Sequence, residues 1–181
     1  ALLRLTQPPG QVTARHLNFD GIDLLAASEA ELRRIRGRRI SMVLQDPKFS
    51  LNPIMKVGEQ IAEACRLHER LSRAQAHDKA LNMLEAVRIR DPKRVFDAYP
   101  HEVSGGMGQR IMIAMMLAPD PDLLIADEPT GNLDEATADV VLGEFLKLVR
   151  LEGSAALIAT HNERIAAKMD RTLRLHEGIL G

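Results

Sequence analysis

Short apolar runs that alternate with helical stretches constrain the fold of this chain more than any other feature. Leu123–Ala126 and Ala155–Thr160 have the length and composition of buried strands, and residues 134–152 between them have a helical pattern. Short buried strands separated by helices are typical of parallel sheets covered on both faces. The sequence therefore predicts an α/β fold with a mostly parallel sheet flanked by helices.

The remaining elements follow from the same patterns. Further strands are expected over Val12–Phe19, which the turn pair Asp20-Gly21 closes, over Ile40–Leu44 and over Arg171–Leu175. Helices are expected over Glu29–Arg36, Val57–Leu71, Gly105–Leu117, Asp134–Glu152 and Asn162–Met169, with one more from Ser72 to about Val87. Ser28 with Glu31, and Ser72 with Gln75, have the spacing of capping boxes, which mark helix starts.

The middle of the chain differs from both ends. Between Lys48 and Val103 the β-branched runs disappear and helical periods dominate. One apolar stripe contains Val57 and Ile61, and the next helix contains Ala80 and Leu84 at the same kind of spacing. We therefore expect a helical subdomain inserted into an α/β protein.

Composition excludes several classes of protein. The sequence has 24 Lys+Arg and 25 Asp+Glu, a net charge of −1, which argues against a nucleic-acid binder that depends on a basic surface. The single cysteine, Cys65, excludes an internal disulfide framework. No apolar run approaches the roughly 20 residues that cross a bilayer. The chain opens at Ala1 with what reads as the tail of an earlier helix, so we expect an N-terminally truncated protein.

The strongest chemical signal is the pair of carboxylates, Asp127 and Glu128, that follows the apolar strand Leu123–Ala126. Ligand sites of parallel sheets lie at the carboxyl ends of the strands. One carboxylate there can hold Mg²⁺ against nucleotide phosphates, and the next can polarise the attacking water. A solvated strand end without a ligand explains the pair equally well when it is taken alone.

A glycine-rich segment, Ser104–Arg110, begins the helix Gly105–Leu117. Glycines let the backbone approach an anion, and helix N-termini favour negative charge. The alternative is an ordinary N-cap. Two further polar residues follow strands: His161 can donate to a phosphate or orient water, and Gln45 can contact Mg²⁺ or water. Both residues have a structural alternative. His161 would then be a histidine with a purely structural role, and Gln45 an ordinary turn residue.

In their order and spacing these residues resemble the ATP-binding subunit of ABC transporters. The resemblance assigns Gln45 to the Q-loop, Val103–Met107 to the signature motif, Leu123–Asp127 to Walker B, Gly131–Asp134 to the D-loop and His161 to the switch histidine. It implies a P-loop NTPase (RecA-like) fold. Residues 1–47 would then be the remaining N-terminal part of the ATPase core, 48–103 the helical subdomain, and 104–181 the rest of the core.

The resemblance also implies roles for the site residues and two cofactors, ATP and Mg²⁺. Glu128 and His161 would be catalytic, and Asp127 with Gln45 would serve the metal. The residues implied in nucleotide binding are Gln45, Ser104, Gly105, Gly106, Met107, Gln109 and Asp134. Each nucleotide would meet the Walker motifs of one subunit and the Ser104–Gly106 segment of the other.

The implied partners are a second ABC ATPase subunit, in a homo- or heterodimer, membrane-spanning permease subunits and a substrate-binding protein, with no nucleic acid. Residues Phe49–Met55 are candidates for the permease contact. The implied location is peripheral, on the cytoplasmic face of the inner membrane.

Resemblances to two subfamilies, and the lack of a phosphate-loop motif, leave alternative functions open. Segments such as Tyr99–Glu102 resemble dipeptide, oligopeptide and nickel importers, whereas Thr130–Asp134 resembles lipoprotein-releasing ATPases. The sequence contains no G-x-x-x-x-G-K-[ST] phosphate loop, so we expect the chain by itself to bind ATP poorly. The hypotheses are an importer ATPase, an export-type ATPase, a remnant that does not hydrolyse ATP, and a soluble ABC protein of DNA repair or translation.

Overall fold

The computed structural model describes residues 2–6, 8–43, 50–131, 133–151, 153–177 and 179–180. Its central sheet has three parallel strands in the order β3 (Ile40–Val43), β4 (Leu123–Asp127) and β5 (Ala155–Ala159). In register, Ile125 of β4 lies between Met42 and Leu157. The predicted α/β fold with a parallel sheet flanked by helices is confirmed.

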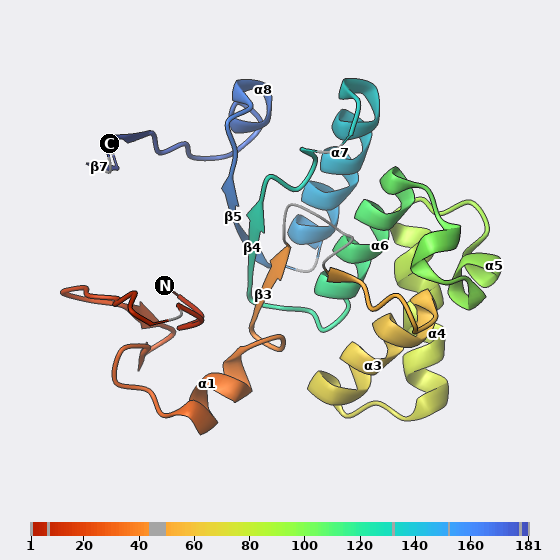
Figure 1. Cartoon of the computed structure of the whole chain (residues 1–181), viewed down its shortest axis with the longest axis horizontal. Helices are drawn as coiled ribbons and strands as arrows, with labels where there is room; N and C mark the ends of the chain where they lie inside the picture. Colours follow the sequence, from red (N-terminus) through yellow and green to blue (C-terminus); the bar gives the residue numbers. More distant parts are fainter. Residues whose placement is uncertain are drawn as a thin grey trace.

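The helices surround this sheet unevenly (Figure 1). α6 (Gly105–Leu117) and α7 (Glu135–Leu151) lie beside the strands, and α3 (Val57–Glu69), α4 (Arg73–Ala86) and α5 (Pro92–Asp97) lie beyond α6. The shorter elements are α1 (Glu29–Ile35), the 3₁₀ turn η1 (Pro100–Glu102) and α8 (Glu163–Ala166). Two small antiparallel hairpins complete the fold, β1 (Asn18–Phe19) with β2 (Ile22–Asp23), and β6 (Leu175–His176) with β7 (Ile179–Leu180).

Both predicted capping boxes are confirmed. The Ser28 hydroxyl accepts from the Glu31 amide at 3.3 Å, and the Glu31 carboxylate accepts from the Ser28 amide at 2.8 Å. Ser72 and Gln75 make the same reciprocal pair at 3.3 and 3.0 Å. These bonds satisfy backbone donors that the first helical turn leaves free, so the local sequence determines where α1 and α4 begin.

One large apolar core joins one face of the sheet to the helices. It contains Leu124 and Ala126 of β4, Ile113 and Leu117 of α6, and Phe145 of α7, all at most 2 % exposed. The same cluster continues into α3, α4 and α5 through buried residues that include Ile61, Ala80, Leu84 and Phe96. The helical region is therefore packed onto the α/β part through α6.

The opposite face of the sheet is covered only in part. A second cluster places Leu24, Leu32 and Ile40 against the half-buried Leu123 and Ile125 of β4. It does not extend to β5, where Leu157 is 49 % exposed. The prediction of a fully buried strand over Ala155–Thr160 is therefore wrong, because the described residues cover β5 on one face and burial alternates along it.

Two predicted strands are mostly absent. Of Val12–Phe19 only Asn18–Phe19 pairs, and of Arg171–Leu175 only Leu175 pairs, in the β6–β7 hairpin. The other residues of both segments have no neighbouring strand in the described part of the chain, and a strand without a partner leaves its backbone groups to water. The Asp20-Gly21 turn is confirmed, with both residues at positive φ (49° and 79°) as a two-residue hairpin requires.

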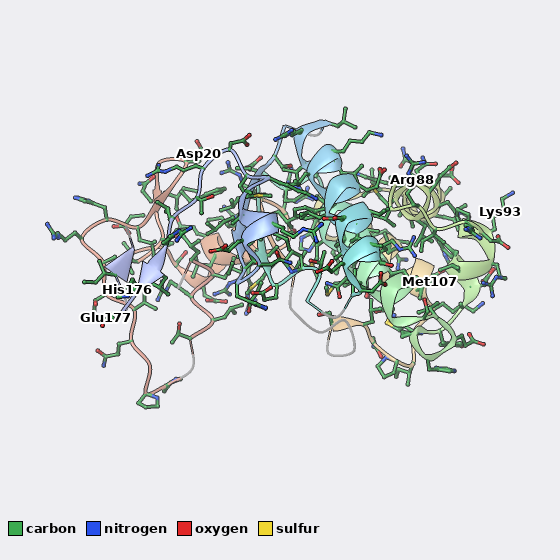
Figure 2. The ribbon with its side chains drawn as sticks, turned by 90° about the horizontal axis from the view of Figure 1, so that it is seen from above. Asp20, Arg88, Lys93, Met107, His176 and Glu177 are labelled. Atoms are coloured by element: carbon green, nitrogen blue, oxygen red, sulfur yellow. The ribbon has the colours of Figure 1, made fainter. Side chains whose placement is uncertain are left out.

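The short helices differ most from expectation. The helix expected over Asn162–Met169 is four residues long, Glu163–Ala166, and Asn162 is its N-cap. Helix α5 was not expected from the sequence, although its cap Asp91 and the following Pro92 are a helix-start signal. Figure 2 shows Lys93 of α5 at the opposite end of the molecule from His176 and Glu177 of the β6–β7 hairpin.

Candidate functional site

The carboxyl ends of β4 and β5 bring the strongest sequence candidates together. The arrowheads of both strands point to the same end of the molecule, where α8 lies (Figure 1). The ladder continues one residue beyond β4, since the Glu128 amide donates to the Ala159 carbonyl at 2.9 Å. This last bond places Glu128 beside Thr160 and His161, the residues that follow β5.

Glu128 is held by several hydrogen bonds. One carboxylate oxygen, Oε2, accepts from the Thr160 hydroxyl at 3.0 Å. The other, Oε1, accepts from the His161 backbone amide at 2.6 Å and lies 2.6 Å from the His161 ring nitrogen Nδ1. The carboxylate thus has a fixed orientation at a strand end, as a group that handles a water molecule must have.

These contacts also determine the charge of Glu128. Burial raises the pKa of this carboxyl, but the hydrogen bonds from the amide and ring of His161 and from Thr160 together lower it below its ordinary value. Glu128 is therefore ionised at neutral pH despite being only 14 % exposed. An ionised carboxylate that is largely shielded from solvent can accept a proton from water or hold a water molecule in place.

His161 is paired on one side and open on the other. Its Nδ1 faces Glu128, while the side chain is 86 % exposed. A carboxylate at this distance favours a proton on Nδ1. The exposed Nε2 is then an acceptor in the neutral ring and a donor only in the imidazolium form, so donation from Nε2 to an anion requires a doubly protonated ring.

Asp127 differs from its neighbour. It ends β4 and is exposed, and its carboxylate makes no hydrogen bond or ion pair with any residue that the structure describes. A free carboxylate at a strand end is the type of ligand that Mg²⁺ uses when its other ligands are waters and phosphates. No group of three or more His, Cys, Asp or Glu that could hold a metal occurs among the described residues, so Asp127 would need external ligands.

The glycine-rich segment forms the first turn of α6, as predicted. Ser104 is the N-cap, and its hydroxyl accepts from the Met107 amide at 3.3 Å. Gly105 is exposed, with open space where a Cβ would be, and Gly106 lies against the start of α7. Met107 packs partly against the core. The exposed Gly105 at the start of this turn leaves room for an anion beside the helix N-terminus.

Gln109 is placed differently from the expected nucleotide contact. Its side chain is fully buried, and its Nε2 donates to the backbone carbonyl of Pro129. Because the carboxamide points into the protein, it cannot contact a nucleotide in this conformation. Tertiary packing therefore decided which side of the helix Gln109 occupies.

Asp134 is the cap of α7. Its carboxylate accepts from the Thr137 amide at 3.0 Å, and hydrogen bonds from the side chain and amide of Thr137 lower its pKa. Next to it, Arg164 of α8 bridges Glu135 and Asp139 of α7 at 3.1 and 3.0 Å. These ion pairs join the helix after His161 to the helix that Asp134 caps.

Three expected residues and one missed residue complete the comparison with the sequence. Gln45 and Phe49 lie outside the described residues, as does Asn132 of the D-loop segment. Thr160 was not expected to be a site residue, because a threonine in an apolar run is typical of an ordinary strand. Its position directly before His161, at a strand end, was the available signal.

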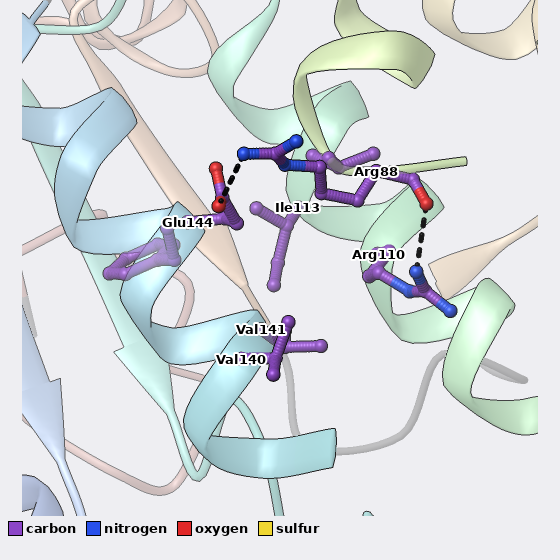
Figure 3. Close-up of a pocket in the computed structure, with 8 residues that line it drawn as sticks. Arg88, Arg110, Ile113, Val140, Val141 and Glu144 are labelled. Atoms are coloured by element: carbon purple, nitrogen blue, oxygen red, sulfur yellow. Dashed lines mark hydrogen bonds and ion pairs between the residues drawn. The ribbon is translucent and has the colours of Figure 1, made fainter. Parts of the chain in front are cut away.

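The pocket drawn in Figure 3 lies elsewhere, between α6, α7 and the loop after α4. Arg88 pairs there with Glu144 at 3.1 Å, and Arg110 donates to the Arg88 carbonyl at 3.0 Å. None of the candidate site residues lines this pocket. The candidate site at the strand ends is therefore separate from this pocket.

Comparison with known proteins identifies the family. Residues 1–131 match the ABC transporter family. The chain belongs to the ABC transporter family. Among solved structures, this ABC transporter chain is similar to the ATP-binding cassette MJ0796, in a dimeric post-hydrolysis state bound to ADP and Pi. That match has a TM-score of 0.72 at 29% identity and covers 82% of this chain and 63% of the other.

Curated relatives of this ABC transporter chain are peptide transport proteins. It is 51% identical over 150 residues to the "Probable peptide ABC transporter ATP-binding protein y4tR" of Sinorhizobium fredii, covering 83% of this chain and 45% of that protein. It is 42% identical over 168 residues to the dipeptide transport ATP-binding protein DppD of Escherichia coli, covering 93% and 51%. The chain thus spans about half the length of these relatives.

Within the described residues, no helix has both the length and the apolar character needed to cross a membrane.

Proposed function

We propose that this chain is part of an ATP-binding and ATP-hydrolysing subunit of an ABC transporter that powers peptide uptake. The Glu128–His161 pair at the carboxyl ends of β4 and β5 carries the proposal, because it supplies an oriented carboxylate beside an exposed imidazole. The family match and the peptide transport relatives support the transporter assignment and the substrate class. A further relative is named for glutathione import, and glutathione is a short peptide, which supports the same substrate class.

In this proposal Glu128 orients the attacking water and accepts its proton, which its ionised state allows. His161 presents its exposed ring edge to the terminal phosphate, with Glu128 holding the opposite ring nitrogen, Nδ1. Phosphoryl transfer depends mainly on such positioning and charge stabilisation.

Asp127 fits a Mg²⁺ ligand, since its carboxylate is exposed and unpaired among the described residues. Bound there, Mg²⁺ would neutralise developing phosphate charge. Gln45 is proposed as its second contact on the basis of the resemblance alone. ATP is the cofactor that the family implies, and a solved relative holds ADP.

The first turn of α6 is proposed to bind the nucleotide of a second subunit, through Ser104, Gly105, Gly106 and Met107. The amides of Gly105 and Gly106 and the positive end of a 13-residue helix favour an anionic group. Asp134 is proposed to contact the facing subunit. Because the His161 side chain and Gly105 are exposed in one chain, closure by a second copy or a related subunit would complete the site.

The proposed partners beyond that dimer are permease subunits and a substrate-binding protein, at the cytoplasmic face of the inner membrane. The helical region between residues 48 and 103 is proposed to contact the permease, through residues 49–55. The boundaries at residues 47 and 103 stay predictions.

A chimera tests the proposed function. The stretch of DppD that matches this chain is replaced by this chain, and dipeptide uptake and ATP hydrolysis are measured in Escherichia coli lacking DppD. We expect both activities to be restored. Glu128→Gln should lower kcat at least about 100-fold while ATP still binds, because the general base is lost.

The matched control is Glu63→Gln, which removes an exposed carboxylate of α3 far from the strand ends. It should hydrolyse ATP at the unmutated rate. Hydrolysis retained by Glu128→Gln contradicts the proposed role, and hydrolysis without uptake contradicts the peptide transport assignment.

A further inference from the structure

Gln109 is a buried polar side chain that the proposed mechanism leaves unused, and it contacts the turn formed by Glu128 and Pro129. It lies five residues after Ser104, on α6, and is 0 % exposed. Its Nε2 donates to the Pro129 carbonyl, whereas its Oε1 has no hydrogen-bond partner among the described residues. A buried carboxamide with an unpaired oxygen destabilises the core relative to an apolar side chain of similar size. The bond to Pro129 is therefore the feature that distinguishes Gln109 from a Leu or Met at this place.

Pro129 is covalently next to Glu128, in a turn whose backbone needs support. Glu128 has φ +45°, in the left-handed region that disfavours side chains with a Cβ. A residue before proline also favours extended backbone. Contacts around the turn must therefore hold it in this conformation.

Those contacts reach the turn from two sides. From the β5 side, the Ala159 carbonyl, Thr160 and His161 bond Glu128. From the α6 side, Gln109 bonds the carbonyl of Pro129. Only the second contact connects Glu128 to the helix whose first turn contains Ser104 and Gly106.

The same helix also contacts the segment after the turn. A Cβ at Gly106 would lie 3.5 Å from Leu133 and 3.7 Å from Thr137, so the start of α6 packs directly on the start of α7. Contacts from α6 thus reach residues on both sides of Gly131, and among them the Gln109–Pro129 hydrogen bond lies nearest to Glu128 in the sequence.

We propose that Gln109 is a positioning residue that couples the first turn of α6 to the orientation of Glu128 through the Pro129 carbonyl. Its importance for catalysis rests on the proposed function, in which the α6 turn meets the nucleotide of one site and Glu128 acts in the other. Binding of a nucleotide at the first turn of α6 would then change the orientation of the Glu128 carboxylate, which acts in the second site of the same subunit.

The bond itself is tested in the unmutated chain by NMR. The side-chain Nε2 protons of Gln109 should exchange with solvent at least about tenfold more slowly than those of the exposed Gln75 on α4. This measurement needs no variant. Equal exchange rates for the two glutamines would overturn the proposal.

The coupling is tested with Gln109→Leu and a matched control, Gln60→Leu. Gln60 is also a buried helical glutamine, 6 % exposed, and its Nε2 donates to the carbonyls of Asn52 and Met55, away from Glu128. In Gln109→Leu, the His161 amide should exchange about tenfold faster and the pKa of Glu128 should rise toward its ordinary value. Neither quantity should change in Gln60→Leu.

Unchanged His161 exchange and Glu128 pKa in folded Gln109→Leu would overturn the coupling, as would equal changes in Gln60→Leu. None of these readouts uses nucleotide. A DppD chimera that fails to hydrolyse ATP therefore contradicts the proposed function and leaves the NMR result standing.

Discussion

At the residue scale, Glu128 shows how neighbouring donors reverse the effect of burial. Burial disfavours its charge, yet Thr160 and His161 lower the pKa of the carboxyl below its ordinary value of 4.5. The folded chain therefore binds this proton less readily than the unfolded chain. The resulting stabilisation is fully present above about pH 4.5 and is lost as the pH falls through the folded value.

Thr160→Val tests this pH-dependent stabilisation, because valine has nearly the same shape as threonine. The variant lacks the hydroxyl that donates to Glu128 at 3.0 Å, so at pH 7 its free energy of unfolding should fall by about 1–2 kcal/mol. The difference from the unmutated chain should shrink at pH 3, where Glu128 becomes protonated. Urea titrations at both pH values measure this, with Thr160→Ser as the control that keeps the hydroxyl. An equal difference at pH 7 and pH 3 would show that the hydroxyl does not stabilise the charged carboxylate.

At the element scale, packing decides the role of two glycines that lie within helices. A Cβ at Gly58 of α3 would lie 2.0 Å from the ring of Phe96 in α5, so α3 and α5 approach closely only because this side chain is absent. A Cβ at Gly143 of α7 would have nothing within 4 Å. Helix propensity favours alanine at both positions by about 1 kcal/mol.

The same substitution should therefore have opposite effects. Gly143→Ala should raise the free energy of unfolding by about 0.5–1 kcal/mol, since only propensity acts. Gly58→Ala should lower it by about 1–3 kcal/mol, because the Phe96 ring must move. Thermal unfolding of the two variants measures both effects. A stabilising Gly58→Ala would mean that α3 and α5 are not held in this packing.

At the scale of the whole molecule, the layers cover the two faces of the sheet unequally. Helices α6 and α7 cover one face along all three strands, whereas the cluster around Leu24 and Leu32 covers β3 and β4 on the other. Leu124 is consequently 0 % exposed and Leu157, on the neighbouring strand, 49 % exposed.

The two leucines should respond differently to truncation. Leu124→Ala should destabilise the chain by about 2–5 kcal/mol, the range for fully buried leucines. Leu157→Ala should destabilise it by less than about 1.5 kcal/mol, because half of its side chain already contacts water. Denaturant titrations of the chain in solution measure both. Equal losses would indicate that another surface covers β5.

By itself, the sequence determined the features that depend on local chemistry. The capping boxes at Ser28 and Ser72, the Asp20-Gly21 turn and the strand before Asp127 all follow from neighbouring residues. Motif order in the chain was enough to identify the family. Strands that need a distant partner were predicted poorly, as Val12–Phe19 and Arg171–Leu175 show, because pairing depends on residues far along the chain.

Only the tertiary structure decided how the site is connected. The parallel ladder brings Thr160 and His161 to Glu128, across more than thirty positions of sequence. Packing of α6 turns Gln109 inward onto Pro129, and incomplete coverage of the sheet exposes Leu157. The type of each side chain determines its chemistry. Its orientation and charge depend on neighbouring groups, and contacts between distant segments of the chain determine which groups those are.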